Sequence, residues 1–347
     1  MRLVTVDPAC DPAWAGLLDR HPRSLFHSPP WLAALREAYG FIARAHLVQD
    51  AAGASISGLA FCEIDDLLGR RILSLPFSDA CDPLVDAAAA WERLFAALTA
   101  TGLPVRLRCL DNPILREDRR LVVTRHARWH TVPVTESDEA LWSGLAGSSR
   151  RAIRKAERSG VEIRPLAEDE GVGEFRRLHV ALRKRKYRML AQPLVFFEAL
   201  RHHFEPVSAW FPLGAFVGSR LVAATLYLRW GDTLYYKFNA SSLDDLDLRP
   251  NSLLVWAGMR LARSLGCSRL DLGPSDDDQP GLIRFKRNFG AAERELRVLD
   301  YRPPGWRDDR ADAVRRLLGD LTSLLTAAEL SDEVAARAGT LLYRFFA

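Results

Sequence analysis

Three strand-forming segments follow one another between residues 207 and 240, and two short glycine turns join them. They read VSAWFPLGAFVG, SRLVAATLYLRWG and DTLYYKFNA, with turns at Val217-Gly218-Ser219 and Trp230-Gly231-Asp232. Runs of apolar and aromatic residues with such turns predict an antiparallel meander. Helix-forming segments precede and follow it, at residues 172–205 and 251–266. This order predicts a mixed α/β fold with a largely antiparallel sheet and disfavours a Rossmann fold or a TIM barrel, because those alternate strictly.

The first half of the chain echoes this order. Residues 31–39 (WLAALREAY) align with residues 196–204 (FFEALRHHF), and ISGLAFCEI at 56–64 falls where LVAATLYLR stands at 221–229. Segments this short also align by chance, but the favoured interpretation is one α/β module used twice. We therefore predict an N-terminal module over 1–138, a second module over 139–306 and a helical tail over 307–347.

Composition excludes several classes of protein. The 347 residues carry a formal net charge of +4, which is not the profile of a dedicated DNA-binding domain. No run approaches the ~20 apolar residues that a membrane-spanning helix needs, and the N-terminus has no apolar stretch of the signal-peptide type. The five cysteines form no CxxC pair, so neither a disulfide framework nor a zinc ribbon is expected. We expect a cytoplasmic protein with no integral membrane segment and no DNA partner.

Common catalytic motifs are also missing. The sequence contains no GxGxxG after a strand, no GxxxxGK[ST] and no GxSxG, which disfavours nucleotide-binding folds and α/β-hydrolases. His126 and His130 are four residues apart, but we expect them on a strand, where this spacing builds no metal site. Residues 287–292 fit the R-x-x-G-x-A pattern of acetyl-CoA sites. That pattern must open a helix to bind a diphosphate, and here we expect a strand to follow it.

Four stretches of the second half carry a family resemblance. They are RRAIRKAERSG at 150–160, LYYKFNA at 234–240, PNSLLVW at 250–256 with LDLG at 270–273, and GLIRFKRNFG at 281–290. The order and spacing of these four stretches resemble those of the Fem and FemAB-related acyltransferases, which are GNAT-like or BioF2-like. The resemblance covers roughly residues 140–300. In the first half the resemblance rests on residues 75–79 and 82–84.

The resemblance implies two GNAT-like modules and transfer of an aminoacyl group from aminoacyl-tRNA. Family members that build peptidoglycan cross-bridges often carry a helical-hairpin insertion. No long heptad stretch is present in this chain, so a cell-wall acceptor does not follow from the resemblance.

Acyl transfer to an amine requires a neutral amine, a stabilised oxyanion and a held donor, but no covalent nucleophile. By the resemblance, Lys286 lies beside the acyl donor or the substrate phosphates, and the alternative is a solvated lysine. Asp271 ends an apolar strand, where it either orients or deprotonates the amine or else caps the next loop. Tyr236 and Lys237 alternate on a strand, so we expect one of them to line the cleft. We name Lys286, Asp271 and Tyr236 as candidate catalytic residues.

The candidate donor-binding residues are mostly cationic. Two basic clusters, one on the helix near 150–158 and one near 183–188, suit a phosphate-rich ligand, although ordinary solvated faces look the same. Asn251 starts a helix, where an N-cap role is the simpler explanation. The expected donor or substrate contacts are Arg151, Arg154, Lys155, Arg185, Arg188, Lys237, Asn251 and Phe285.

The sequence thus predicts an N-acyltransferase without a cofactor or metal, whose donor is aminoacyl-tRNA and whose acceptor is a peptide-like amine or a peptidoglycan precursor. One alternative is an acyl-CoA-dependent N-acyltransferase that acts on an amino sugar or a small metabolite. Another is a non-catalytic binding module that keeps the fold and its basic groove.

Overall fold

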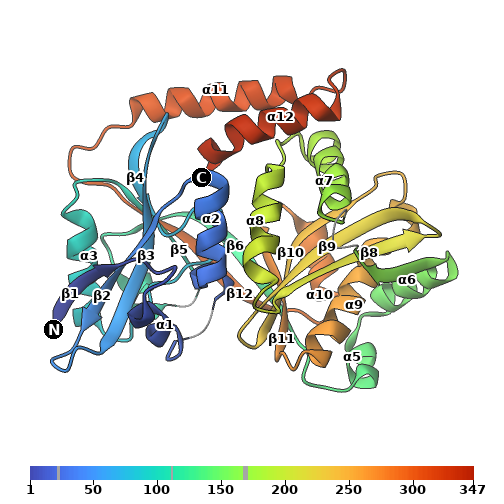
Figure 1. Ribbon diagram of the computed structural model, residues 1–347, viewed down its shortest axis with the longest axis horizontal. Coiled ribbons are helices and arrows are strands. Elements are labelled where there is room, and N and C mark those ends of the chain that lie inside the picture. Colours follow the sequence, from blue (N-terminus) through green and yellow to red (C-terminus); the bar gives the residue numbers. More distant parts are fainter. Residues whose placement is uncertain (22–23, 111, 167–170) are drawn as a thin grey trace. The chain divides into compact units, whose positions relative to one another are not determined.

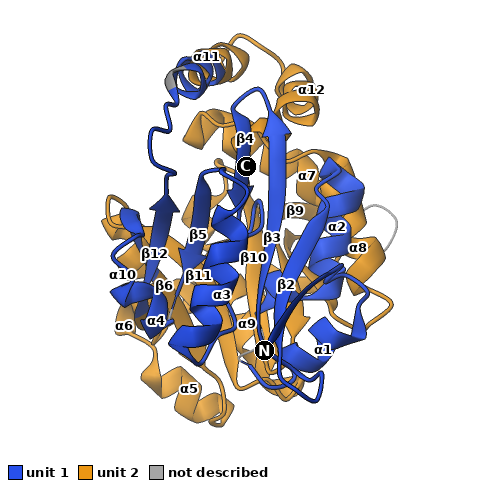
Figure 2. Ribbon diagram, turned by 90° about the vertical axis from the view of Figure 1, so that its left-hand side faces the viewer, with its two compact units in different colours: residues 1–128, 294–318, 347 blue, residues 129–293, 319–346 orange. Residues whose placement is uncertain are grey.

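The chain folds into two compact units, as seen in a computed structural model that describes residues 1–21, 24–110, 112–166 and 171–347 (Figure 2). The first unit holds residues 1–128, 294–318 and 347, and the second holds 129–293 and 319–346. The chain leaves the first unit within strand β6 (Val122–Pro133) and returns within β12 (Ala292–Tyr301). The domain boundaries expected after residues 138 and 306 stay a prediction.

The first unit is an α/β module whose strands lie in the order β1-β2-β3-β4-β5-β12 (Figure 1). All neighbouring pairs are antiparallel except β4 and β5, which are parallel. The elements are β1 (Arg2–Val6), α1 (Pro12–Leu18), α2 (Pro29–Tyr39), β2 (Ala43–Gln49), β3 (Ser55–Asp66), β4 (Gly69–Leu73), α3 (Ala88–Thr99), β5 (Val105–Cys109) and α4 (Pro113–Glu117).

Helix α2 shows why the local sequence folds as it does. The Ser28 hydroxyl accepts a hydrogen bond from the N–H of Trp31, Pro29 occupies the first turn, and Gly40 ends the helix at φ 74°. Each residue suits its position, since serine caps, proline fits the first turn and glycine tolerates positive φ. The indole of the buried Trp31 donates to Ser78 Oγ at 2.8 Å, which fixes α2 against the segment after β4.

The second unit contains the predicted meander. Strands β7 to β10 pair antiparallel in sequence order, β11 pairs parallel with β10, and β6 lies next to β11. The elements are α5 (Asp138–Gly144), α6 (Gly147–Arg158), β7 (Val161–Pro165), α7 (Gly171–Leu182) with a π-helical turn (Arg183–Tyr187), α8 (Leu194–Phe204), β8 (Trp210–Val217), β9 (Arg220–Trp230), β10 (Thr233–Ser241), α9 (Pro250–Ser264), β11 (Arg269–Asp276) and α10 (Pro280–Arg287). The mixed α/β fold class with a helical tail, α11 (Asp309–Leu325) and α12 (Asp332–Leu342), is confirmed. Among the described residues, no helix is both long and apolar enough to cross a membrane.

Two local expectations differ from the structure. The sequence over 136–160 predicts one helix, but it breaks into α5 and α6, because Leu145 and Ala146 adopt extended backbone angles and the Ala146 N–H donates to Asn288 O at 2.9 Å. The sequence over 70–77 (RRILSLPF) predicts a strand, but β4 ends at Leu73, since Leu75 and Phe77 adopt φ of 81° and 53°, which no strand accommodates.

Helix α9 packs closely on the meander. Tyr227 of β9 is fully buried, and its hydroxyl donates to Leu254 O of α9 at 2.8 Å. A Cβ added at Gly258 would lie 2.5 Å from Tyr227 Oη and 2.6 Å from its Cε1. Helix α9 therefore needs glycine at this position to approach the sheet.

Replacement of Gly258 by alanine should destabilise the second unit. The added methyl group must displace the buried Tyr227 ring, and overpacking of this kind costs ~1–3 kcal/mol. Urea denaturation of Gly258→Ala, with Gly319→Ala as the matched control, measures the effect. Gly319 lies within α11 with nothing within 4 Å of its Cβ position, so the control should gain up to ~1 kcal/mol from helix propensity. Equal stability of both variants would contradict the packing argument.

Candidate functional site

Strands β10 and β11 run side by side for only a short distance. Their parallel pairing joins Thr233 to Arg269, Leu234 to Leu270 and Tyr235 to Asp271, and among the described residues no later pair follows. Both strands nevertheless continue, β10 to Ser241 and β11 to Asp276. The two strands therefore part after Tyr235 and Asp271, which leaves backbone N–H and C=O groups without partners from the neighbouring strand.

A bulge in β10 falls at the same place. Tyr236 pairs with Tyr227 of β9, and Phe238 pairs with Leu226, so Lys237 is an extra residue in β10. A bulge re-aims side chains and interrupts the alternation of faces. The expectation that Tyr236 and Lys237 simply alternate is therefore corrected. The Lys237 ammonium lies 5.1 Å from the centroid of the Phe238 ring.

Asp271 and Lys286 hold β11 where it leaves β10. Asp271 is 5% exposed, and its carboxylate accepts hydrogen bonds from Trp129 Nε1 at 2.8 Å and from the Gly273 N–H at 2.7 Å. Gly273 has φ 69°, a conformation that glycine adopts without strain. Lys286 of α10 is 6% exposed and donates to the carbonyls of Gly273 at 3.0 Å and Pro274 at 2.8 Å. Lys286 is thus not the solvated lysine of the simpler interpretation, and it ties α10 to β11.

Tyr236 is the third candidate catalytic residue, and it lies next to the point where the strands part. Burial raises the pKa of its phenol above the ordinary value, against the opposing effect of a hydrogen bond with Thr225. The ring packs edge-to-face on Tyr227, with 5.6 Å between centroids. The Tyr236 hydroxyl is therefore protonated at neutral pH and is suited to donating a hydrogen bond.

A network of amides and hydroxyls extends from Tyr236 to the start of α9. Asn239 Nδ2 donates to Thr225 Oγ1 at 3.0 Å and to Asn251 Oδ1 at 3.2 Å, and Asn251 Nδ2 donates to Ser241 Oγ at 3.3 Å. Asn251 is therefore not the N-cap that the simpler interpretation expected. Helix α9 begins at Pro250, and its N-cap residue is Arg249 at φ 61°, without a capping side-chain hydrogen bond. The network fixes Asn251 against β10.

The basic residues expected on α6 lie on its solvent side. Ile153 and Ala156 are buried against the core, whereas Arg151, Arg154, Lys155 and Arg158 are all exposed. Within the described ranges none of these four cations takes part in an ion pair, although Arg154 lies over the Trp142 ring at 5.4 Å. Helix α6 therefore presents a positively charged face to solvent.

The remaining candidates lie elsewhere in the second unit. Phe285 of α10 stacks near Phe289, with 5.1 Å between ring centroids, and packs against the core. Arg185 and Arg188 belong to the π-helical turn and its end, where Arg185 contacts Asp332 at the start of α12 and Arg188 contacts Thr326 after the end of α11. The structure thus gathers Asp271, Tyr236 and Lys286 around the parting strands, and the two basic clusters belong to separate helical elements.

Three residues of this region were missed by the sequence reasoning. Trp129 holds Asp271, and Thr225 and Asn239 hold Tyr236 and Asn251. Asn239 lies in the recognised LYYKFNA stretch, so its position was a usable signal. Trp129 and Thr225 lie on other strands, and no local pattern links them to Asp271 or Tyr236.

The histidine pair and the R-x-x-G-x-A segment have the secondary structure that the sequence predicts. His126 and His130 both lie on strand β6, where His126 Nδ1 is 2.8 Å from Glu295 Oε1 and His130 is fully buried. The R-x-x-G-x-A segment runs from the end of α10 into β12, and no helix follows it.

Comparison with known proteins agrees with this fold. Residues 145–287 match the family model described as the acetyltransferase (GNAT) domain. No curated protein matches the chain. The crystal structure of FemX superposes with a TM-score of 0.68 at 14% identity and covers 91% of this chain and 99% of that chain. A tandem GNAT protein from the clavulanic acid biosynthesis pathway gives 0.55 at 11% identity, over 88% and 99% of the two chains.

A third similar structure is L-PGS from Bacillus licheniformis, with a TM-score of 0.55 at 12% identity over 91% of this chain and 98% of that chain. These likenesses confirm the predicted fold of two GNAT-like modules. Together with the GNAT family match, they support the predicted class of the chain, an acyltransferase.

The bonds around Asp271 should be energetically coupled to Trp129. Asp271→Asn weakens two hydrogen bonds to a buried carboxylate and should cost ~1–3 kcal/mol of unfolding free energy. Trp129→Phe removes one of the donors. Because the two side chains share one bond, the double variant should lose less than the sum of the single variants, by ~0.5–3 kcal/mol.

Urea denaturation of the two single variants and the double variant measures this coupling. Trp142→Phe provides the control, since Trp142 lies beside Arg154 and shares no hydrogen bond with Asp271 in the described part of the chain, so its effect should add to that of Asp271→Asn. Additive losses for Asp271 and Trp129 would show that the bond contributes nothing.

Proposed function

We propose that the protein is an N-acyltransferase of the Fem type, which transfers an aminoacyl group from aminoacyl-tRNA to the amine of a peptide-like acceptor or a peptidoglycan precursor. The observation that carries this proposal is the parting of β10 from β11 next to Tyr236, a residue whose hydroxyl is protonated at neutral pH. The main chain of β10 beyond Tyr235 suits an extended acyl donor, because such a donor pairs with main-chain N–H and C=O groups.

The chemistry needs little from the side chains. The neutral amine attacks the ester carbonyl of the donor, a tetrahedral oxyanion forms, and the C–O bond to the ribose then breaks. In this proposal the Tyr236 hydroxyl donates a hydrogen bond to the oxyanion or to the departing ribose oxygen, which takes up the proton that the amine releases. No covalent enzyme intermediate and no cofactor is involved.

Asp271 and Lys286 act as positioning residues in this scheme. Both carboxylate oxygens of Asp271 already accept hydrogen bonds, and the Lys286 ammonium already donates to two carbonyls of β11. Their contribution is to hold the shape of β11 beside Tyr236, because a site is effective only when its geometry is fixed in advance.

The exposed cations of α6 provide the contact for the donor. Arg151, Arg154, Lys155 and Arg158 form a positively charged face without acidic partners among the described residues, which suits the phosphates of an RNA backbone. An RNA donor also places the reaction in the cytoplasm. The likeness to FemX extends over both units of the chain and supports the same choice.

An acyl-CoA donor is the second candidate, because residues 145–287 match the GNAT acetyltransferase domain. A diphosphate is commonly bound by the free N–H groups of a helix start. Helix α9, which follows β10, begins with Pro250, which has no N–H, and the Ser252 N–H already bonds to Arg249 O at 3.1 Å. Because the first turn of α9 offers few free N–H groups to a diphosphate, it favours the tRNA donor over CoA. A non-catalytic binding module is the third possibility, and it predicts no turnover with either donor.

The donor assay separates these possibilities. Purified protein is incubated with labelled aminoacyl-tRNAs or with labelled acetyl-CoA, together with a cell extract stripped of both as the source of acceptors. Label should enter amide products from tRNA only, and RNase should abolish the transfer. Transfer from acetyl-CoA alone would replace the proposal by CoA-dependent chemistry.

Tyr236→Phe should lower kcat without unfolding the protein. The variant keeps the ring that packs on Tyr227 and loses only the hydroxyl, and loss of one hydrogen bond to the developing oxyanion costs ~10²–10³-fold in kcat. KM should change little. The matched control is Tyr235→Phe on the same strand, which should keep kcat within a few fold. Equal activity of Tyr236→Phe and the wild-type protein would remove this residue from the mechanism.

Charge reversal on α6 should weaken tRNA binding and flatten its dependence on salt. For each phosphate that the protein no longer neutralises, the slope of log K against log salt should become shallower by ~0.7–0.9. The test variant carries Arg151→Glu, Arg154→Glu and Lys155→Glu, and tRNA affinity is measured from 50 to 300 mM salt (about the range where such interactions are screened).

The control variant carries Arg93→Glu, Arg316→Glu and Arg337→Glu, which change the net charge equally at exposed positions of α3, α11 and α12. If both triple variants lost the same affinity, overall charge rather than the α6 face would explain the binding.

A further inference from the structure

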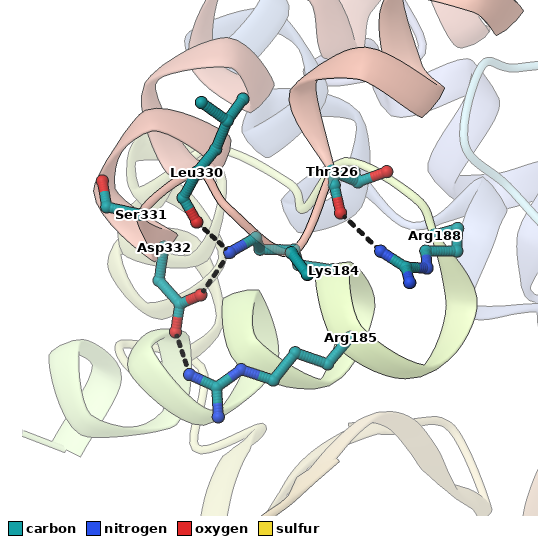
Figure 3. Close-up of a pocket in the computed structure, with 8 residues that line it drawn as sticks. Lys184, Arg185, Arg188, Thr326, Leu330, Ser331 and Asp332 are labelled. Carbon is teal, nitrogen blue, oxygen red and sulfur yellow. Dashed lines mark hydrogen bonds and ion pairs between the residues drawn. The ribbon is translucent and has the colours of Figure 1, made fainter.

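A cavity of about 450 Å³ lies beside the π-helical turn of the second unit (Figure 3). On one side it is lined by Lys184, Arg185 and Arg188, and on the other by Thr326 and Ser331 of the segment that joins α11 to α12 and by Asp332, the first residue of α12. The π-helical turn continues α7, so the three cations come from one short stretch of chain.

The charges that line this cavity do not balance. Asp332 is the one carboxylate among the described lining residues, and it pairs with both Lys184 Nζ at 3.2 Å and Arg185 at 3.1 Å. Arg188 donates to the neutral carbonyl of Thr326 at 2.9 Å and has no carboxylate partner in the described part of the chain. Three cations therefore face one anion, and the cavity carries an excess of positive charge.

The cations differ in how accessible they are. Lys184 is 4% exposed and also donates to the Leu330 carbonyl. Its ammonium group is therefore part of the cavity wall and is not available to a ligand. The side chain of Arg185 is 58% exposed, and Arg188 is exposed. A guanidinium has five N–H donors, whereas Arg185 donates to Asp332 and Arg188 to Thr326 through one nitrogen each (Figure 3). Most of their donors therefore remain for a ligand.

Close packing of α12 fixes the walls of the cavity. Ala335 and Ala336 of α12 are buried against Val180 and Ala191. A Cβ at Gly339 would lie 2.2 Å from the backbone oxygen of Ala191, so α12 approaches as closely as glycine permits. The backbone itself is unusual here, since Arg188 has φ 52° after a π-helical turn, and both features are frequent at functional sites.

We infer that this cavity is a binding site for phosphate groups, held by the guanidinium groups of Arg185 and Arg188. Arginine suits phosphate because its planar fork donates two parallel hydrogen bonds. Only the identity of the ligand rests on the proposed function: with a tRNA donor, the phosphates belong to the RNA backbone. A small diphosphate is the other source of the same chemistry.

The test measures binding of inorganic pyrophosphate by calorimetry at low salt, with neither donor nor acceptor present. Arg185→Gln with Arg188→Gln should weaken binding by about tenfold or more, because charge-assisted hydrogen bonds are lost. The control is Arg316→Gln with Arg337→Gln, two exposed arginines of α11 and α12, which should leave the affinity unchanged.

Asp332→Asn gives a result of the opposite sign. It removes the one described carboxylate of the cavity and keeps the shape of the side chain, so pyrophosphate should bind about two- to fivefold more tightly. Damage to the fold would weaken binding instead. Unchanged affinity in the double arginine variant would overturn the inference, and so would weaker binding in an Asp332→Asn variant whose circular dichroism spectrum matches that of the wild-type protein.

A competition arm identifies the source of the phosphates. If tRNA displaces pyrophosphate, and the two arginine substitutions also weaken tRNA binding, the cavity takes the RNA backbone. If tRNA binds without displacing pyrophosphate, the cavity takes a small diphosphate. The proposed function fails separately, when aminoacyl transfer is absent while pyrophosphate still binds the wild-type protein and not the double variant.

Discussion

The divergence of two parallel strands is the constraint on which the candidate site depends. A parallel pair that stayed in register along its whole length would use the backbone groups of β10 and β11 on each other. Here the pairing ends at Tyr235 and Asp271. Beyond that point β11 is fixed by buried polar bonds: the Asp271 carboxylate accepts from Trp129 and the Gly273 N–H, and Lys286 donates to the carbonyls of Gly273 and Pro274. Buried charges persist only when they are bonded in this way.

On the side of β10, a bulge and an amide network lie where the two strands diverge. Lys237 is the extra residue, and Asn239 connects Thr225 to Asn251 at the start of α9. Because the close packing of Gly258 on Tyr227 fixes α9 on the meander, the polar groups of β10 are held by a rigid helix. The result is a site of few charged groups, and the proposed function uses the Tyr236 hydroxyl as its proton-bearing group.

The two basic clusters, which look alike in the sequence, have different surroundings in the structure. On α6 the cations point into solvent without acidic partners in the described ranges. After α7, the cations Lys184, Arg185 and Arg188 instead contact the start of α12 and the segment before it, and Asp332 offsets part of their charge. Both groups suit phosphate. The first offers an open face and the second a walled cavity, so the two places are expected to bind phosphates with different geometry.

The sequence by itself determined the fold class and most of the elements. The meander was readable because alternating apolar runs and glycine turns are local signals, and α2 was readable because Ser28, Pro29 and Gly40 are local caps. The sequence also brought forward Asp271, Tyr236 and Lys286, since they lie in the recognised stretches. Only the tertiary structure decided what these residues touch. A carboxylate such as Asp271 looks the same in a sequence whether it is free or bonded to Trp129, and the partner is 142 positions away. The break at Leu145, the bulge at Lys237 and the role of Asn251 depend likewise on contacts between distant segments, which no local pattern specifies.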